Sequence, residues 1–159
     1  MAARARLQEE RKTWRKDHPH GFVAKPQTLP DGSQNLMVWD CVVPGKSYTI
    51  WEGGRIPLTL TFTEDYPTKA PVAHFKPMPN SNQPLFHPNV YPSGEMCLSL
   101  LSHAWTSPAP TIKKVLLGIQ TLLDQPNISN NAQMAAHQAF RTNREHYDQR
   151  VRHQMLLLA

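Results

Sequence analysis

The sequence predicts an α+β protein, in which antiparallel strands fill the first half of the chain and most of the helical sequence follows them. From Ile56 to Thr63, apolar residues alternate with proline or threonine, which is the pattern of a strand with one buried face. After Thr111 the apolar residues recur at helical spacing instead. A chain of 159 residues has the usual size of one domain, so we expect a single domain over residues 1–159.

The first predicted element is an amphipathic helix over residues 3–17. Leu7 and Trp14 are seven positions apart and form a narrow apolar stripe, and His18-Pro19 ends the helix because the residue before a proline disfavours helical backbone. Much of the net charge of +5 lies in this helix, at Arg4, Arg6, Arg11, Lys12, Arg15 and Lys16. No aromatic-rich basic motif accompanies these bases, so they favour an acidic protein surface over nucleic acid.

Four strands are predicted next. Phe22 to Lys25 and Leu36 to Val43 form a hairpin through the turn residues Leu29-Pro30-Asp31-Gly32. The alternating segment is the third strand, and Pro57 places its beginning at an edge or an irregular position. Val72 to Lys76 is a short fourth strand. We therefore expect a four-stranded antiparallel meander.

A long loop and three helices complete the prediction. Pro77 to Met96 is rich in proline and lacks periodicity, and a loop of this length in one domain is usually functional or disordered. Thr111 can cap a core helix that ends at Pro126 and has the apolar positions Ile112, Val115, Leu116, Ile119, Leu122 and Leu123. Ala132 to Arg141 and Arg144 to Leu157 are the two C-terminal helices.

Composition excludes several classes of protein. Two cysteines without paired spacing, and an N-terminus without a secretory leader, favour a reducing compartment, so we expect the nucleus and the cytoplasm. The longest apolar run, Met155 to Ala159, is far too short for a membrane helix, so we expect a soluble protein. The eight histidines lack metal-ligand spacing, and we expect neither a metal nor another cofactor.

The most informative motif runs from Phe86 to Leu98. It places His87-Pro88-Asn89 before Gly94 and sets Cys97 eight positions after the asparagine. This run resembles the active-site signature of the ubiquitin-conjugating enzyme superfamily, and the resemblance implies the ubiquitin-conjugating fold over nearly the whole chain. Within the superfamily the chain most resembles the SUMO-conjugating enzymes, through Arg15 to Pro19, Pro30 to Gly32, Val43 to Lys46, Trp51 to Gly54, Leu85 to Gly94 and Leu116 to Gln120.

The resemblance implies a transferase with a cysteine thioester intermediate. Cys97 receives SUMO from its activating enzyme and passes it to a substrate lysine. A thiolate is a good nucleophile without a dedicated base, whereas a lysine amine with a pKa near 10.4 needs a desolvating groove, for which Tyr91 is the candidate wall. The Asn89 amide could stabilise the oxyanion. The alternative is that Asn89 only ties down its own loop.

Several positions near Cys97 depart from the SUMO-conjugating pattern. Asn130 stands where the family has an aspartate in the lysine channel, and an amide can orient the amine but raises its pKa less than a carboxylate does. We assign Ser93, Glu95 and His74 to substrate binding. His74 and Val72 replace lysines that read an acidic substrate residue, and Glu95 replaces a small residue and would repel one. The substrate preference therefore stays open.

For partners, the resemblance places the activating enzyme and SUMO on Arg11, Arg15 and His18, with a solvated helix face as the alternative. Tyr66-Pro67 and Trp105 match ligase-contacting positions, although an aromatic and prolines could equally be core and turn residues.

The sequence leaves three other functions as alternatives. A cysteine hydrolase would use His87, His103 or His137 as its base, although its usual local signatures are absent. A noncatalytic adaptor on the same fold, and an enzyme for ubiquitin or another modifier, are the other two. Cys41 lies among alternating bulky residues of the second strand and is expected in the core.

Overall fold

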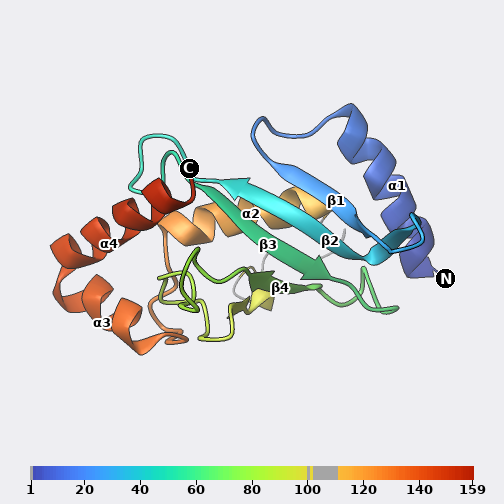
Figure 1. The fold of residues 1–159 in the computed structure, drawn as a ribbon. Helices are drawn as coiled ribbons and strands as arrows, with labels where there is room; N and C mark the ends of the chain where they lie inside the picture. The colour runs from blue at the N-terminus through green and yellow to red at the C-terminus, as the bar shows by residue number, and fades with distance from the viewer. Residues whose placement is uncertain (1, 100, 102–110) are drawn as a thin grey trace.

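The computed structural model describes residues 2–99, 101 and 111–159. One antiparallel sheet has the strand order β1-β2-β3-β4-β5. Its strands are β1 (Val23–Thr28), β2 (Gln34–Pro44), β3 (Arg55–Thr61), β4 (Val72–Phe75) and β5 (Glu95–Met96). The helices are α1 (Ala2–Lys16), α2 (Ile112–Asp124), α3 (Met134–Thr142) and α4 (Arg144–Leu157). Figure 1 shows α2 crossing one face of the sheet, with α1 at one end of the molecule and α3 and α4 at the other.

The predicted apolar stripe of α1 is confirmed. Leu7 and Trp14 are buried, and so are Ala3 and Glu10 on the same face of the helix. The other side chains of α1 are mostly exposed, so most of its basic residues lie at the surface.

The predicted hairpin is also confirmed, and β1 runs farther than expected. It continues through Pro26 to Thr28, with a register shift after Pro26, because an edge strand can accommodate a residue without an N–H group. In the turn, Gly32 has a φ of +87° and donates its N–H to the Leu29 carbonyl at 2.9 Å. Pro57 lies in an interior strand, one residue outside the ladder that β3 forms with β4.

The expectation of four strands is wrong by one short strand. Glu95–Met96 pairs with β4 through Ala73↔Met96 and His74↔Glu95, inside the segment that the sequence predicts as loop. Two residues are too few to show any periodicity, and the pairing depends on backbone groups brought together by the preceding turn. This strand leads directly to Cys97.

The core lies between the sheet and α2. Inward-facing residues of the sheet include Trp39, Cys41, Leu58, Leu60, Ala73 and Phe75, and α2 contributes the six apolar positions predicted for it. The Thr111 hydroxyl accepts the Lys114 N–H at 3.2 Å, which confirms the predicted cap.

The C-terminal helices follow the prediction with one shift. α4 has the expected bounds, but α3 begins at Met134 because the Ala132 N–H donates to the Pro88 carbonyl at 2.9 Å and so belongs to the loop contacts. Arg55 N–H donates to the Leu158 carbonyl at 2.7 Å and ties the end of α4 to β3. Within the described ranges, no helix is long and apolar enough to cross a membrane, and no three His, Cys, Asp or Glu residues group as metal ligands would.

Candidate active site

Cys97 follows β5 directly and lies half-exposed between buried Met96 and Leu98. Its Sγ is 2.7 Å from the Ser99 Oγ. Once the sulfur is a thiolate it can only accept, so the serine hydroxyl must then be the donor. Cys41 is only 2% exposed, and burial raises the pKa of its thiol. The two cysteines therefore have opposite environments, and only Cys97 is accessible to another molecule.

Gly94 is the residue that lets the chain turn into β5. Its φ is +97°, and a Cβ at this position would lie 2.4 Å from the Phe75 carbonyl oxygen. That carbonyl belongs to β4, whose Phe75 N–H donates to the Gly94 carbonyl at 2.8 Å. Both the conformation and the close approach of the two backbones require glycine. The signature glycine therefore sets the position of Cys97 through strand pairing.

Asn89 is fully buried, and its amide joins two loops. Nδ2 donates to the carbonyl oxygens of Asn127 and Asn130 at 2.9 and 3.0 Å and approaches the Asn130 Oδ1 at 3.2 Å, while Oδ1 accepts the Asn127 N–H at 2.8 Å. These contacts support the loop-anchoring alternative. Both amide protons are engaged, so contact with an oxyanion requires one of these bonds to exchange.

His87 is fully buried beneath the same loop. Its Nε2 donates to the carbonyls of Leu122 and Leu123 at 3.0 and 3.1 Å, and Nδ1 accepts the Asn89 N–H at 3.0 Å. Burial lowers the pKa of His87 to about 4, so the ring is neutral near pH 7. With both nitrogens engaged, His87 fastens the loop to the end of α2 and cannot serve as the base of a hydrolase.

The other histidines proposed for a hydrolase give it no support. His137 Nε2 contacts the Ile128 carbonyl at 2.8 Å, in the loop before its own helix. His103 lies outside the described residues.

Tyr91 and Asn130 both follow Asn89 in the chain, and the structure gives each a defined place. The loop carrying Asn130 contacts Asn89 directly, as described above. Tyr91 is 37% exposed and begins a tight turn, in which its N–H donates to the Glu95 carbonyl at 2.9 Å. An exposed aromatic ring beside this turn is compatible with the predicted groove wall, which stays a prediction.

The three predicted substrate-binding residues lie together. Glu95 of β5 and His74 of β4 are direct cross-strand partners, and both are exposed. Ser93 is exposed in the turn before β5, where its Oγ accepts the Glu95 N–H at 3.2 Å. Ser93 and Glu95 lie just before Cys97 in the chain, and strand pairing brings His74 beside Glu95.

Two of the three predicted docking residues, Arg11 and Arg15 of α1, share one surface. Arg11 and Arg15 line an open depression against β1 and β2, together with Lys25, Gln27 and Asp40. His18 stacks on Trp14 with ring centroids 5.1 Å apart, and its Nδ1 contacts the Trp14 carbonyl at 2.8 Å. The depression is therefore predominantly basic, as expected of a surface for an acidic partner.

The predicted ligase contacts are corrected in one respect. Tyr66 is only 2% exposed, so its ring is a core residue, and this burial favours the alternative given for it above. Pro67, which follows a cis peptide bond, is half-buried. Trp105 lies outside the described residues.

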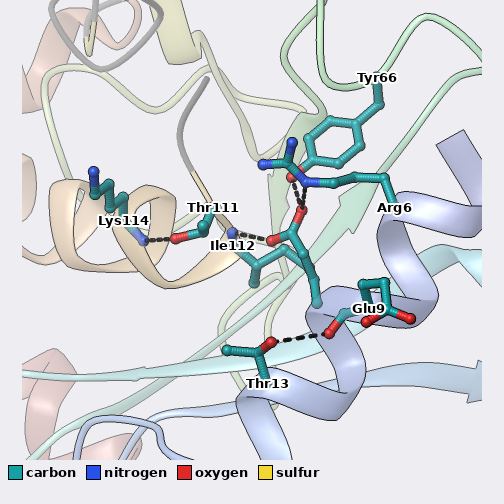
Figure 2. A network of polar contacts seen from close by, with 8 residues as sticks. Arg6, Glu9, Thr13, Tyr66, Thr111, Ile112 and Lys114 are labelled. Carbon is teal, nitrogen blue, oxygen red and sulfur yellow. Dashed lines mark hydrogen bonds and ion pairs between the residues drawn. The ribbon is translucent and has the colours of Figure 1, made fainter. Parts of the chain in front are cut away.

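Glu10 is a residue that the sequence analysis missed. Its carboxylate is buried and accepts the Ile112 N–H at 2.6 Å, the Tyr66 hydroxyl, and the Arg6 Nε at 3.0 Å. In Figure 2 the dashed lines from Arg6, Tyr66 and Ile112, which belong to three parts of the chain, meet at one carboxylate. The signal available in the sequence was its position on the apolar stripe, three residues after Leu7.

Two glutamines were missed as well. Gln133 Nε2 donates to the Leu85 and Val90 carbonyls at 2.9 and 3.0 Å, and Gln154 Oε1 accepts the Phe86 N–H at 2.5 Å. Both hold backbone groups of the loop that carries the signature. The helical region thus fixes the long loop by side-chain hydrogen bonds that no local pattern reveals.

Comparison with known proteins agrees with the fold and the motif. The model of the ubiquitin-conjugating enzyme family matches residues 6–155. The SUMO-conjugating enzyme of Dictyostelium discoideum is 55% identical over 151 residues, which cover 94% of this chain and 91% of the relative. The SUMO-conjugating enzymes of Arabidopsis thaliana and Caenorhabditis elegans are 54% and 50% identical over 152 residues, again covering 94% of this chain and 91% and 87% of the relatives. The chain belongs to the ubiquitin-conjugating enzyme family.

Proposed function

We propose that this protein is a SUMO-conjugating enzyme that carries SUMO as a thioester on Cys97 and transfers it to substrate lysines. The observation that carries the proposal is the half-exposed Cys97 at the end of the signature run, in a chain similar over 94% of its length to three SUMO-conjugating enzymes.

In the first step the Cys97 thiolate attacks the thioester carbonyl that links SUMO to its activating enzyme. A new thioester forms on Cys97, and the cysteine of the activating enzyme leaves as a thiolate. One thioester replaces another, so the exchange needs no oxidant or metal. The Ser99 hydroxyl, 2.7 Å from the sulfur, can donate to the Cys97 thiolate before the attack.

In the second step a neutral lysine amine attacks the thioester, an isopeptide bond forms, and Cys97 leaves as a thiolate. The amine loses one proton overall. Tyr91 forms a wall of the groove that desolvates the amine, and the Asn130 side chain orients it. Asn89 holds the loop of Asn130 in place and stabilises the oxyanion if one of its present bonds exchanges.

The same proposal assigns the partners. The activating enzyme and SUMO bind the basic α1 surface around Arg11, Arg15 and His18, where Arg11 and Arg15 line the depression. Ligases contact the region of Pro67 and Trp105. We place the protein in the nucleus and the cytoplasm, where the free thiol of Cys97 is kept reduced.

The test is a nonreducing gel after mixing the protein with SUMO, its activating enzyme and ATP, beside a parallel reaction with ubiquitin components. A thiol-sensitive adduct with SUMO that is lost in Cys97→Ala and retained in Cys41→Ala supports the proposal. An adduct with ubiquitin alone would mean that the enzyme carries ubiquitin and not SUMO. No adduct with either would favour the noncatalytic adaptor.

A further inference from the structure

The outward face of β4 and β5 lies beside the proposed nucleophile. Strand alternation buries Ala73 and Phe75 and exposes Val72, His74 and Lys76 on the opposite face. Val72 and His74 on β4, and Lys76 directly after it, form one row. Val72 is 43% exposed, so the row begins with an apolar surface.

β5 continues this face up to Cys97. Met96 is buried opposite Ala73, and Glu95 is exposed opposite His74. Met96 and Leu98 are both buried, so half-exposed Cys97 between them faces the same side as Glu95. The carboxylate of Glu95 therefore stands two residues before the sulfur on the same exposed side.

The charges on this face have a defined order. Val72, the member of the row nearest to Cys97, is apolar. His74 comes next and lies opposite Glu95, and Lys76 is the member farthest from the sulfur. Among the described residues, no ion pair is formed by the Glu95 carboxylate. Its negative charge is therefore available to a bound molecule.

An extended substrate would match this spacing. Two residues of extended chain span about 6.6 Å. This step separates Cys97 from Glu95, and it also separates an acceptor lysine from the residue two positions away in an extended substrate. A substrate side chain two positions from the acceptor lysine then reaches the pair of Glu95 and His74. The Glu95 carboxylate attracts a positively charged substrate side chain at this position and repels a negatively charged one.

We propose that Glu95 selects acceptor lysines that have a lysine or arginine two positions away, and disfavours those with an aspartate or glutamate there. This inference rests on the proposed function, because it concerns the substrate of the Cys97 thioester. Single exposed charge pairs change a rate by about fivefold at most. Since arginine and glutamate differ by two charges, we expect a rate ratio of about threefold to tenfold.

The test is single-turnover discharge of the preloaded thioester onto synthetic peptides without a ligase. Each peptide has one lysine and carries arginine or glutamate two positions before or after it. The arginine peptide should react about threefold to tenfold faster at one of these positions, and 0.5 M NaCl should reduce the ratio. In Glu95→Gln the ratio should fall toward one, and in Glu95→Lys it should invert. Glu145→Gln on α4 is the matched control and should show the same rate ratio as the protein without a substitution.

Equal rates for both peptides, or faster discharge onto the glutamate peptide, would overturn the inference while the thioester itself forms normally. If no thioester band with SUMO or ubiquitin is present before the peptide is added, the proposed function fails, and this inference fails with it. The two failures are therefore seen at different steps. Because each variant is scored by a ratio of two rates, a general loss of activity does not imitate the expected result.

Discussion

The two cysteines are the same side chain in opposite surroundings. Cys41 is sealed into β2, where burial raises the pKa of its thiol, while Cys97 is half-exposed with a hydroxyl at 2.7 Å. Since the thiolate is the reactive form, accessibility favours Cys97, and burial disfavours the ionisation of Cys41.

We therefore expect iodoacetamide to modify Cys97 alone in the folded protein near pH 8. Cys41 should react only after unfolding. Ser99→Ala should slow the modification of Cys97 about threefold, because the thiolate loses a hydrogen bond. Peptide mapping by mass spectrometry gives the rate at each cysteine. Equal labelling of both cysteines in the native protein would contradict the structure.

His87 predicts a pH dependence of stability. Its pKa is lowered from about 6.5 to about 4 by burial, so in this range the unfolded chain binds a proton that the folded protein does not. The contribution of His87 to stability is therefore complete above pH 6.5 and is lost as the pH falls toward 4. Protonation would also convert Nδ1 from the acceptor of the Asn89 N–H into a donor.

The expected loss is about 2 kcal/mol in the free energy of unfolding between pH 7 and pH 5. Urea denaturation at a series of pH values measures it. His87→Gln should flatten this part of the profile, whereas His20→Gln, at an exposed histidine, should leave it as it is. A profile that is flat between pH 7 and pH 5 in the unmodified protein would rule out a buried neutral His87.

Among the elements, α1 is joined to α2 by one buried carboxylate. Glu10 satisfies the first N–H of α2 at Ile112 and the hydroxyl of Tyr66, which burial and Glu10 itself keep protonated by raising its pKa. A helix start buried without such a partner leaves its N–H groups unsatisfied. The helix that carries the proposed docking surface thereby also fixes the helix that follows the active-site segment.

Glu10→Ala should destabilise the protein by about 3 kcal/mol, because two buried donors lose their acceptor. Glu10→Gln keeps one carbonyl oxygen and should lose less. The neighbouring Glu9 is exposed and pairs with exposed Lys12, so Glu9→Ala should stay within about 0.5 kcal/mol of the unmodified protein. The midpoints of urea denaturation rank the three substitutions by their loss of stability. Equal losses for Glu9→Ala and Glu10→Ala would show that Glu10 does not join α1 to α2.

The turn between β4 and β5 gives a second prediction for the elements. Gly94→Ala adds both backbone strain at a φ of +97° and a collision with the Phe75 carbonyl, and it should cost at least about 2 kcal/mol and slow thioester formation. Gly32→Ala is the matched control, since Gly32 has a φ of +87° with open space around its Cβ position, and it should cost about 1 kcal/mol without slowing thioester formation. Thioester formation as fast in Gly94→Ala as in the unmodified protein would contradict the proposed positioning role.

For the whole molecule, the sequence predicts the fold well because most elements carry a local signal. The stripe of α1, the alternation of β3, the Thr111 cap and the spacing of α2 can each be identified within a few residues. β5 could not be predicted, since a two-residue strand is defined by its partner. The start of α3 was misplaced because the bond between Ala132 and Pro88 depends on two segments distant in the chain.

The residues of the candidate site also fall into those that the sequence predicts and those that it does not. Cys97 and Gly94 follow from a motif of fixed spacing, and the structure gives Gly94 a steric reason. The contacts of Asn89, Glu10, Gln133 and Gln154 join segments that only the folded chain brings together. Tyr66 shows the limit of the resemblance, because a residue at a partner-contacting position is here a buried hydroxyl donor.

The most direct measurement is the attachment site of SUMO, determined by mass spectrometry on the protein loaded by the activating enzyme and ATP. We predict one SUMO on Cys97 in a thiol-sensitive bond, none in Cys97→Ala, and in Cys97→Ser a slower adduct that resists thiol but is lost in mild alkali, as expected for an oxyester. Attachment of SUMO at Cys41 or at a lysine, with loading retained in Cys97→Ala, would contradict the assignment of Cys97 as the carrier.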